Sequence, residues 1–171
     1  MFSKQIRITG IHGDYLRKYS KDKQGENTQY FTLDDNEGHM GNYYIFENIL
    51  QCFMCAAMIG IIEGKLAAPD NSKTTPANIF ADIVNKNYDN LMRIYQHMIL
   101  TRDLDLSIDA RIKKAFSVDK SNEDAEEERI YSYARGGLEI INDYFKDCKT
   151  FEDVANAIVE LSDKYSINMN D

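Results

Sequence analysis

The sequence predicts a mainly all-α protein, a compact bundle of about five or six helices with an N-terminal extended or hairpin-like arm. Three observations lead to this fold class. Apolar residues recur with a helical period through most of residues 43–171. Only 2 prolines and 9 glycines are present, so few positions oppose a helix. A chain of 171 residues, 43% hydrophobic and 28% charged, has the size and composition of one globular domain.

Residues 1–42 have a different pattern and are predicted to form the arm. Residues 5–11, with the sequence QIRITGI, alternate and are β-branched, which favours a short strand, and residues 29–33 favour a second. Residues 34–42, DDNEGHMGN, are polar and contain two glycines, which indicates a loop. We therefore divide the chain into an N-terminal arm, residues 1–42, and a helical domain, residues 43–171.

The first helices of the domain are predicted from apolar period and end signals. An almost wholly apolar helix is expected to start at Tyr43 and to end at Gly64. Thr75 and Pro76 supply a capping hydroxyl followed by proline, which predicts a helix start. Polar residues 85–87 divide the following apolar stripe into two helices.

Three further helices complete the predicted bundle. Ser107 is expected to cap the first, and its inward-facing residues are predicted to be Ile108, Ile112, Ala115 and Phe116. The second has an acidic first turn, and its predicted inward face is Ile130, Ala134, Leu138, Ile141 and Phe145. Thr150 and Asp153 resemble a capping box for the last helix, with an apolar face of Val154, Ile158, Leu161 and Tyr165.

The charge distribution bears on nucleic-acid binding. A net charge of −8 disfavours non-specific binding to phosphate backbones as the main activity. Residues 1–24, however, hold six basic and two acidic residues. Candidate nucleic-acid-binding residues in this segment are therefore Lys4, Arg7, Arg17 and Lys18. A ligand or DNA-end sensor that works through this basic arm is one alternative function.

Cysteine number and apolar run length predict the compartment. Three cysteines, an odd number, do not form a disulfide framework, which fits a reducing cytoplasm. Residues 1–11 contain two basic residues and no apolar core of a signal peptide. The longest apolar run, residues 52–62, is about half of what a membrane span needs. We expect a cytoplasmic protein that has no membrane partner.

No residue pattern predicts a catalytic or metal centre. Cys52 and Cys55 have the spacing of half a zinc site, but they lie inside an apolar helix and no histidine has ligand spacing. We therefore expect them to pack in the core, and we expect no metal and no cofactor. Gly60-x-x-x-Gly64-Lys65 lacks phosphate-loop spacing and ends a helix instead of starting one. A non-enzymatic protein is the expectation.

One helical pair supplies a competing, catalytic hypothesis. Arg93 and His97 lie one turn apart and project from one helix face. The pair resembles the Arg-x(4–6)-His element of helical RNases of the HEPN class, although only three residues intervene here. A HEPN-like RNase toxin that uses Arg93 and His97 is thus a second alternative function.

Two adjacent glycines are the most distinctive local feature. Gly136 and Gly137 interrupt a helical pattern at a cost of about 1–2 kcal/mol relative to alanine. Close approach of another helix of this chain, or of a partner's backbone, would offset that cost. Both alternatives stay open, and the second makes Arg135, Gly136, Gly137 and Glu139 candidate partner-binding residues.

A family resemblance involves the same glycines. The apolar helix ending in Gly60 to Lys65, the loop and helix pair after it, and the Tyr133-Ala134-Arg135-Gly136-Gly137-Leu138 element together resemble the small accessory proteins known as dnd system-associated protein 4. Residues 45–144 carry the resemblance, and Arg135 stands where the family is expected to have a small polar residue. The family accompanies bacterial DNA-phosphorothioation defence genes and implies an accessory role without catalytic residues.

The leading hypothesis combines these observations. We expect a non-catalytic accessory subunit of a bacterial anti-phage defence complex that binds a larger protein, a nuclease or an ATPase, through a helical face. Its association with DNA would then be indirect, through that partner. The aromatic content, 11 Tyr and 8 Phe, suits a protein interface better than a phosphate backbone, and a homo-oligomer is compatible with it.

Overall fold

The computed structural model describes residues 1–21, 31–34, 40–72, 75–117 and 123–165. These residues are mainly helical, which confirms the predicted fold class, but they form seven helices instead of five or six. The helices are α1 Gly10–Tyr19, α2 Ile49–Glu63, α3 Ala81–Lys86, α4 Tyr88–Arg102, α5 Ile108–Phe116, α6 Glu123–Phe145 and α7 Phe151–Tyr165. Two antiparallel strand pairs accompany them, formed by β1 Ile6–Ile8 with β4 Ala77–Ile79 and by β2 Phe31–Asp34 with β3 Met40–Tyr43.

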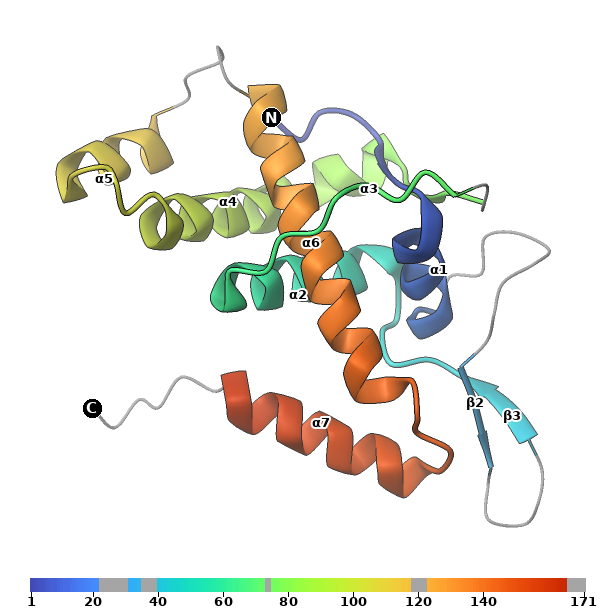
Figure 1. The fold of residues 1–171 in the computed structure, drawn as a ribbon. Coiled ribbons are helices and arrows are strands. Elements are labelled where there is room, and N and C mark those ends of the chain that lie inside the picture. The colour runs from blue at the N-terminus through green and yellow to red at the C-terminus, as the bar shows by residue number, and fades with distance from the viewer. Residues whose placement is uncertain (22–30, 35–39, 73–74, 118–122, 166–171) are drawn as a thin grey trace.

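Helices α2 and α6 cross at the centre of the molecule, and the other elements surround this crossing (Figure 1). The two backbones approach closely because small residues face each other. A β-carbon placed on Gly60 of α2 would lie only 2.0 Å from the carbonyl oxygen of Tyr133 in α6. Glycine therefore sets the distance between these helices, as it does wherever backbones must come into contact.

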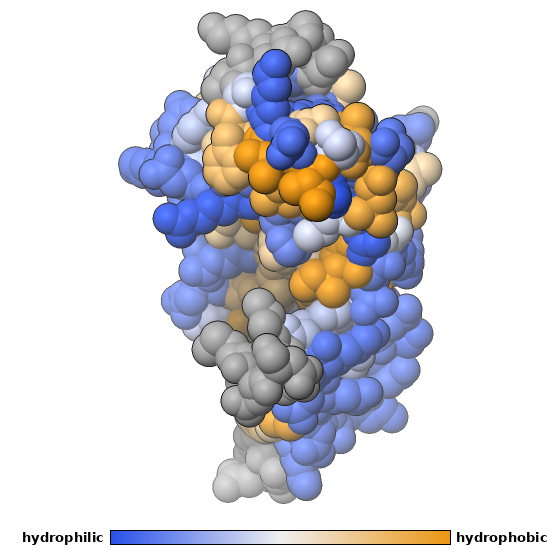
Figure 2. Space-filling view, turned by 90° about the vertical axis from the view of Figure 1, so that its left-hand side faces the viewer, coloured by the Kyte–Doolittle hydropathy of each residue, from blue (hydrophilic) through white to orange (hydrophobic). Residues whose placement is uncertain are grey.

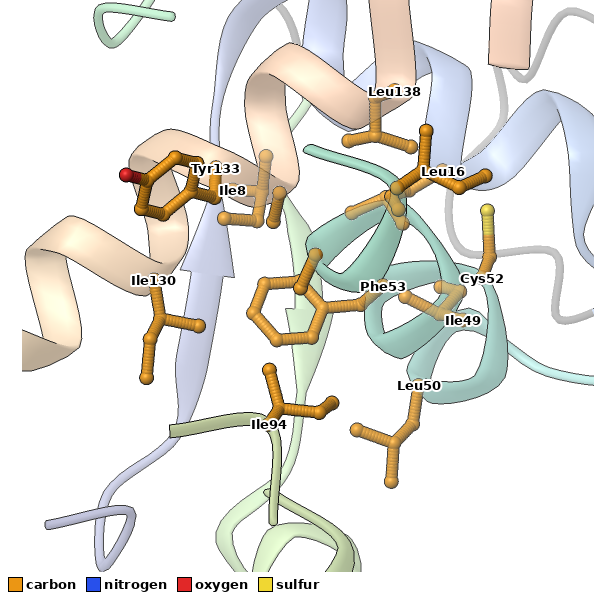
Figure 3. Packing of buried hydrophobic residues seen from close by; sticks show 14 of the residues in the cluster. Ile8, Leu16, Ile49, Leu50, Cys52, Phe53, Ile94, Ile130, Tyr133 and Leu138 are labelled. Atoms are coloured by element: carbon orange, nitrogen blue, oxygen red, sulfur yellow. The ribbon is translucent and has the colours of Figure 1, made fainter. Parts of the chain in front are cut away.

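The hydrophobic core lies around α2. This helix is apolar on nearly every side, and its buried residues contact α1, α4 and α6. Figure 3 shows side chains from β1, α1, α2, α4 and α6 directed into one cluster, in which the labelled residues are Ile8, Leu16, Ile49, Leu50, Cys52, Phe53, Ile94, Ile130, Tyr133 and Leu138.

Capping residues fix the two ends of α2. Gly64 follows the last turn with φ +68°, and the amide of Lys65 donates to the carbonyl of Gly60 at 2.9 Å, which confirms the predicted stop. The predicted start at Tyr43 is wrong, because Asn48 caps the helix by accepting a hydrogen bond from the amide of Gln51 at 2.9 Å. Tyr43 itself ends strand β3.

The N-terminal segment differs from the predicted arm. The short strand at its start is confirmed as β1, but the chain then forms helix α1, and Phe2, Ile6, Leu16 and Tyr19 are buried in the core. The pairing of β1 with β4, across more than sixty intervening residues, ties this segment to the helical body. Local pattern reveals no such distant partner, and this is why the sequence favoured an arm.

The same strand pair displaces a predicted helix start. Residues after Pro76 form strand β4 instead of a helix, and α3 begins only at Ala81. The strand forms because Ile6 and Ile8 supply an antiparallel partner. The predicted division near residues 85–87 is confirmed, since α3 ends at Lys86 and α4 begins at Tyr88.

Other local predictions are confirmed. The Ser107 hydroxyl accepts from the amide of Ala110 at 3.3 Å and so caps α5. The amide of Thr150 donates to Asp153 at 2.9 Å, and the amide of Asp153 donates back to the Thr150 hydroxyl at 3.2 Å, forming the capping box of α7. Every residue predicted for the inward face of α6 is buried.

Candidate functional site

The glycine pair lies at an internal contact. A β-carbon on Gly136 would lie 2.1 Å from the carbonyl oxygen of Lys65, and Gly137 packs on α2. Arg135 is buried beside them, where its Nε donates to the carbonyl oxygen of Ala67 at 2.9 Å and its Nη2 pairs with Glu128 at 2.6 Å. Close approach within this chain therefore accounts for the glycines, and a further role of Arg135, Gly136 and Gly137 in partner binding stays a prediction.

Glu139, the fourth predicted partner-binding residue, joins three parts of the fold. Its Oε1 lies 3.2 Å from Nε2 of His12 on α1, and its Oε2 lies 3.0 Å from Nζ of Lys65 in the loop after α2. Burial raises the pKa of Glu139, but the hydrogen bonds from Lys65 and His12 outweigh that effect and lower it. The side chain of Glu139 is 38% exposed, so it makes these contacts while remaining accessible to water.

The four basic residues proposed for nucleic-acid binding have different surroundings. Arg17 is buried, with its guanidinium donating to the carbonyl oxygen of Thr75 and to Asp14. Lys18 is half-buried, and this burial lowers its pKa. Lys4 and Arg7 are exposed, and Lys4 lies 3.7 Å from Asp124. Of these four, Lys4 and Arg7 are thus the exposed residues that a phosphate could reach, and that contact stays a prediction.

The proposed RNase pair lies on α4. Arg93 is exposed and His97 is half-buried. Burial and the nearby charge of Arg102 lower the pKa of His97, which favours the neutral imidazole at pH 7. The hydroxyl of Thr101 donates to the backbone carbonyl of His97 at 2.7 Å, a contact that leaves the imidazole uninvolved.

The cysteines are free thiols in apolar surroundings. Cys52 is fully buried and Cys55 is mostly covered, and burial raises the pKa of both thiols. Cys52 therefore lies where the sequence predicted, in the core on α2, whereas Cys55 is only partly buried and packs against the core. Within the described residues no cluster of three or more His, Cys, Asp or Glu has an arrangement that would hold a metal ion.

Helix α5 has its apolar face turned outward, opposite to the prediction. Ala115 is buried as expected, but Ile108, Ile112 and Phe116 are 67%, 47% and 64% exposed. Leu104, in the loop four residues before Ile108, is 71% exposed. Figure 2, which views the left-hand side of Figure 1, shows apolar side chains gathered in the upper half of the molecule, where α5 lies. We call Leu104, Ile108, Ile112 and Phe116 the α5 stripe.

Ion pairs beneath α5 explain this orientation. Lys114 points inward and lies 2.7 Å from Asp103 and 2.6 Å from Glu126. Arg129 of α6 completes the cluster at 2.6 Å from Asp103. Arg111 also points toward the body and donates to the carbonyl oxygen of Leu100 at 2.7 Å. Because Arg111 and Lys114 bind the body, the apolar residues of α5 face away from it.

A second apolar surface is the groove between α2 and α7. It encloses about 370 Å³ and is lined by Cys55, Met58, Ile59, Ile62, Ile158, Leu161, Ser162 and Tyr165. Two of the large apolar residues in this α2–α7 groove, Ile62 and Ile158, are 46% and 45% exposed. Glu63 closes one end, because its Oε1 lies 3.1 Å from Lys164 and accepts from the Tyr165 hydroxyl at 2.9 Å.

Comparisons with known proteins supply no relative. The chain matches no protein-family model, and no curated protein or solved structure shows significant similarity to it. Among the described helices, none is both long enough and apolar enough to cross a membrane. The surfaces of this molecule are therefore the first guide to its function.

Sequence reasoning missed both apolar surfaces, although a signal for each was present. The helical period identified Ile108, Ile112 and Phe116 as one face, and Ile158 with Leu161 as another. Period alone assigns such a face to the core, since that is the usual location. The sequence contains more apolar helix faces than a protein of this size can bury, and that surplus was the signal for an interface.

Proposed function

We propose that this protein is a non-catalytic interaction subunit that binds an amphipathic helix of a larger protein in the α2–α7 groove. The observation that carries the proposal is an apolar, preformed hollow of about 370 Å³ in which Ile62 and Ile158 remain 46% and 45% exposed. Burying a fully exposed side chain of this size is worth roughly 1.5–3 kcal/mol, and a partner that covers the exposed part of both residues gains about half of that for each.

The shape and chemistry of the groove favour a helix as the occupant. An amphipathic helix presents apolar side chains at i, i+3, i+4 and i+7, and these fill a groove between two helices. Met58 lies in the groove, and its flexible thioether adapts to the side chains that enter. The Glu63–Lys164 ion pair and the hydrogen bond from the Tyr165 hydroxyl to Glu63 connect α7 to α2, so the two walls of the groove are already linked.

The charge of α7 indicates which residues the partner helix carries beside its apolar face. Helix α7 carries four acidic residues, Glu152, Asp153, Glu160 and Asp163, and one basic residue, Lys164. Glu152 and Glu160 are exposed. A partner helix with lysine or arginine beside its apolar face would therefore be attracted to this surface, and an acidic one would be repelled.

The resemblance of residues 45–144 to the accessory proteins of defence loci suggests a class of partner protein. We extend the proposal to a larger subunit of a bacterial anti-phage assembly, a nuclease or an ATPase encoded beside this gene. Under this proposal the chain contributes a docking surface, and the chemistry belongs to the partner.

The test is co-expression with the products of neighbouring genes, followed by size-exclusion chromatography. We expect a stable complex with the unaltered chain and its loss with Ile158→Asp, because a buried carboxylate without a cationic partner opposes association. Val159→Asp is the matched control, since Val159 is the next residue of α7, is 58% exposed and does not line the groove.

Two results would overturn the proposal. One is elution of the chain as a free protein in every combination. The other is a complex that survives Ile158→Asp and Ile62→Asp. The defence role has its own test, since deletion of the gene should lower phage resistance of the host, and intact resistance would remove that part of the proposal.

A further inference from the structure

We infer that the α5 stripe is a self-association surface, through which two copies of this chain pack their α5 helices antiparallel about a twofold axis. This inference is independent of the α2–α7 groove. It starts from Ile108, Ile112 and Phe116, which follow one another at intervals of four residues on α5, and from Leu104 in the loop before that helix; all four are between 47% and 71% exposed. The three helical residues lie on one side of α5 and form an apolar ridge.

The ridge is held in place from beneath. Lys114 on the opposite side of α5 is bound to Asp103 and Glu126, and Arg111 is bound to the carbonyl oxygen of Leu100. Turning α5 to bury its apolar residues would break these contacts and would carry two cations away from their partners. The apolar ridge is therefore a fixed feature of the surface, and a second molecule is what can cover it.

Charges beside the ridge favour a second copy as that molecule. Asp109 and Lys113 are exposed, lie one turn apart on the same flank of the ridge, and form no ion pair with any residue that the structure describes. Antiparallel pairing places Asp109 of one copy beside Lys113 of the other, and the twofold axis repeats the contact. Antiparallel helix dipoles also attract each other, which supports the same orientation.

The size of the ridge sets the expected strength. A helix of nine residues, Ile108–Phe116, is about 14 Å long, so the contact is smaller than the roughly 1,200–2,000 Å² of a standard stable interface. We therefore expect a reversible dimer with Kd of about 10–100 µM rather than a permanent one.

Sedimentation of the full chain over concentrations from about 1 to 500 µM tests the inference, because this range spans the expected Kd. The average mass should rise toward that of a dimer. Ile112→Asp should leave a monomer at every concentration, whereas Val159→Asp, at an equally accessible apolar residue of α7, should dimerise as the unaltered chain does. Circular dichroism of each variant shows whether helical content is retained.

Charge reversal tests the orientation. Asp109→Lys alone and Lys113→Asp alone should each weaken the dimer about tenfold, because both copies of the pair become repulsive. The double variant Asp109→Lys with Lys113→Asp should restore association. A monomer at about 500 µM overturns the inference, as does a dimer that survives Ile112→Asp or a double variant that is no stronger than the single ones. None of these results affects the α2–α7 groove. The Ile112→Asp variant should still bind the partner helix there.

Discussion

Gly137 of α6 packs against the backbone of Ala56 in α2, so closely that a β-carbon at residue 137 would lie 1.8 Å from the carbonyl oxygen of Ala56. That oxygen belongs to a buried helix and cannot move aside as the end of a flexible side chain can. Gly60 makes the reciprocal contact with the carbonyl oxygen of Tyr133. The position of the central crossing therefore depends on glycine at these two residues, whatever their lower helix propensity costs.

Replacement of Gly137 tests this contact. Gly137→Leu should lower the free energy of unfolding by about 1–3 kcal/mol or more, because the new side chain overpacks a backbone contact. Urea denaturation followed by circular dichroism measures the loss. Ala125→Leu, at an exposed residue of the same helix, should change it by less than about 0.5 kcal/mol. Equal stability of the two variants would contradict the internal role of Gly137.

The N-terminal segment gives a second prediction. Phe2 is buried in the core, so Phe2→Ala should lower the free energy of unfolding by about 3–5 kcal/mol. Lys4→Ala, at an exposed residue two positions away, should have little effect. The measurement is again urea denaturation. If the segment were a detached arm, both substitutions would leave the free energy of unfolding nearly unchanged, and that outcome would contradict the packing of this segment on the core.

Features encoded by a few neighbouring residues were predictable from the sequence. The end of α2 at Gly64 follows from the freedom of glycine at positive φ, and the box formed by Thr150 and Asp153 spans one turn. The buried face of α6 followed from its period, since Ile130, Leu138 and their neighbours repeat with every turn. Each of these signals lies within the element that it specifies.

Features that depend on distant partners were not predictable. Strand β4 forms because Ile79 pairs with Ile6, which lies in a segment read as an arm. Helix α5 was placed with Ile108 and Ile112 inward, because the period defines a stripe but not the side on which the body lies. The ion pairs of Lys114 decide the side, and their acidic partners belong to other elements.

The candidate site was partly predictable for the same reason. The sequence singled out Gly136 and Gly137 as a close contact, which the structure places within the chain. It did not indicate the α2–α7 groove, because Ile62 and Ile158 each belong to an ordinary amphipathic helix. How much of an apolar face a neighbour leaves uncovered is a property of packing, and only the assembled structure gives it.

The RNase alternative predicts an activity that we do not expect. Arg93 and His97 are separated by three residues, and the lowered pKa of His97 leaves little imidazolium to protonate a leaving group at pH 7. Purified protein incubated with single-stranded RNA should therefore cleave it no faster than a buffer blank. Cleavage that is lost in both His97→Ala and Arg93→Ala would restore the toxin hypothesis and overturn the non-catalytic role.

The ion-pair cluster beneath α5 makes stability depend on pH. Asp103 lies 2.7 Å from Lys114 and 2.6 Å from Arg129. Burial raises the pKa of Asp103, but the hydrogen bonds from Lys114 and Arg129 outweigh it, so the pKa lies below the ordinary value of 3.8. Below about pH 4 the unfolded chain thus binds a proton that the folded chain still excludes. The stabilisation by Asp103 is complete above that pH and is lost as the pH falls through the lowered pKa.

Asp103→Asn should remove this component. At pH 7 the variant should have a free energy of unfolding lower by about 1–3 kcal/mol, because Lys114 and Arg129 lose a charged acceptor. The difference between the two proteins should shrink as the pH falls from about 4 to 2, where Asp103 becomes neutral in the unaltered chain. Urea denaturation at several pH values measures both curves, with Asp105→Asn as the control at an exposed carboxylate two residues away. Parallel curves for the unaltered chain and Asp103→Asn would show that Asp103 has the same pKa folded and unfolded, and the cluster would then not be what orients α5.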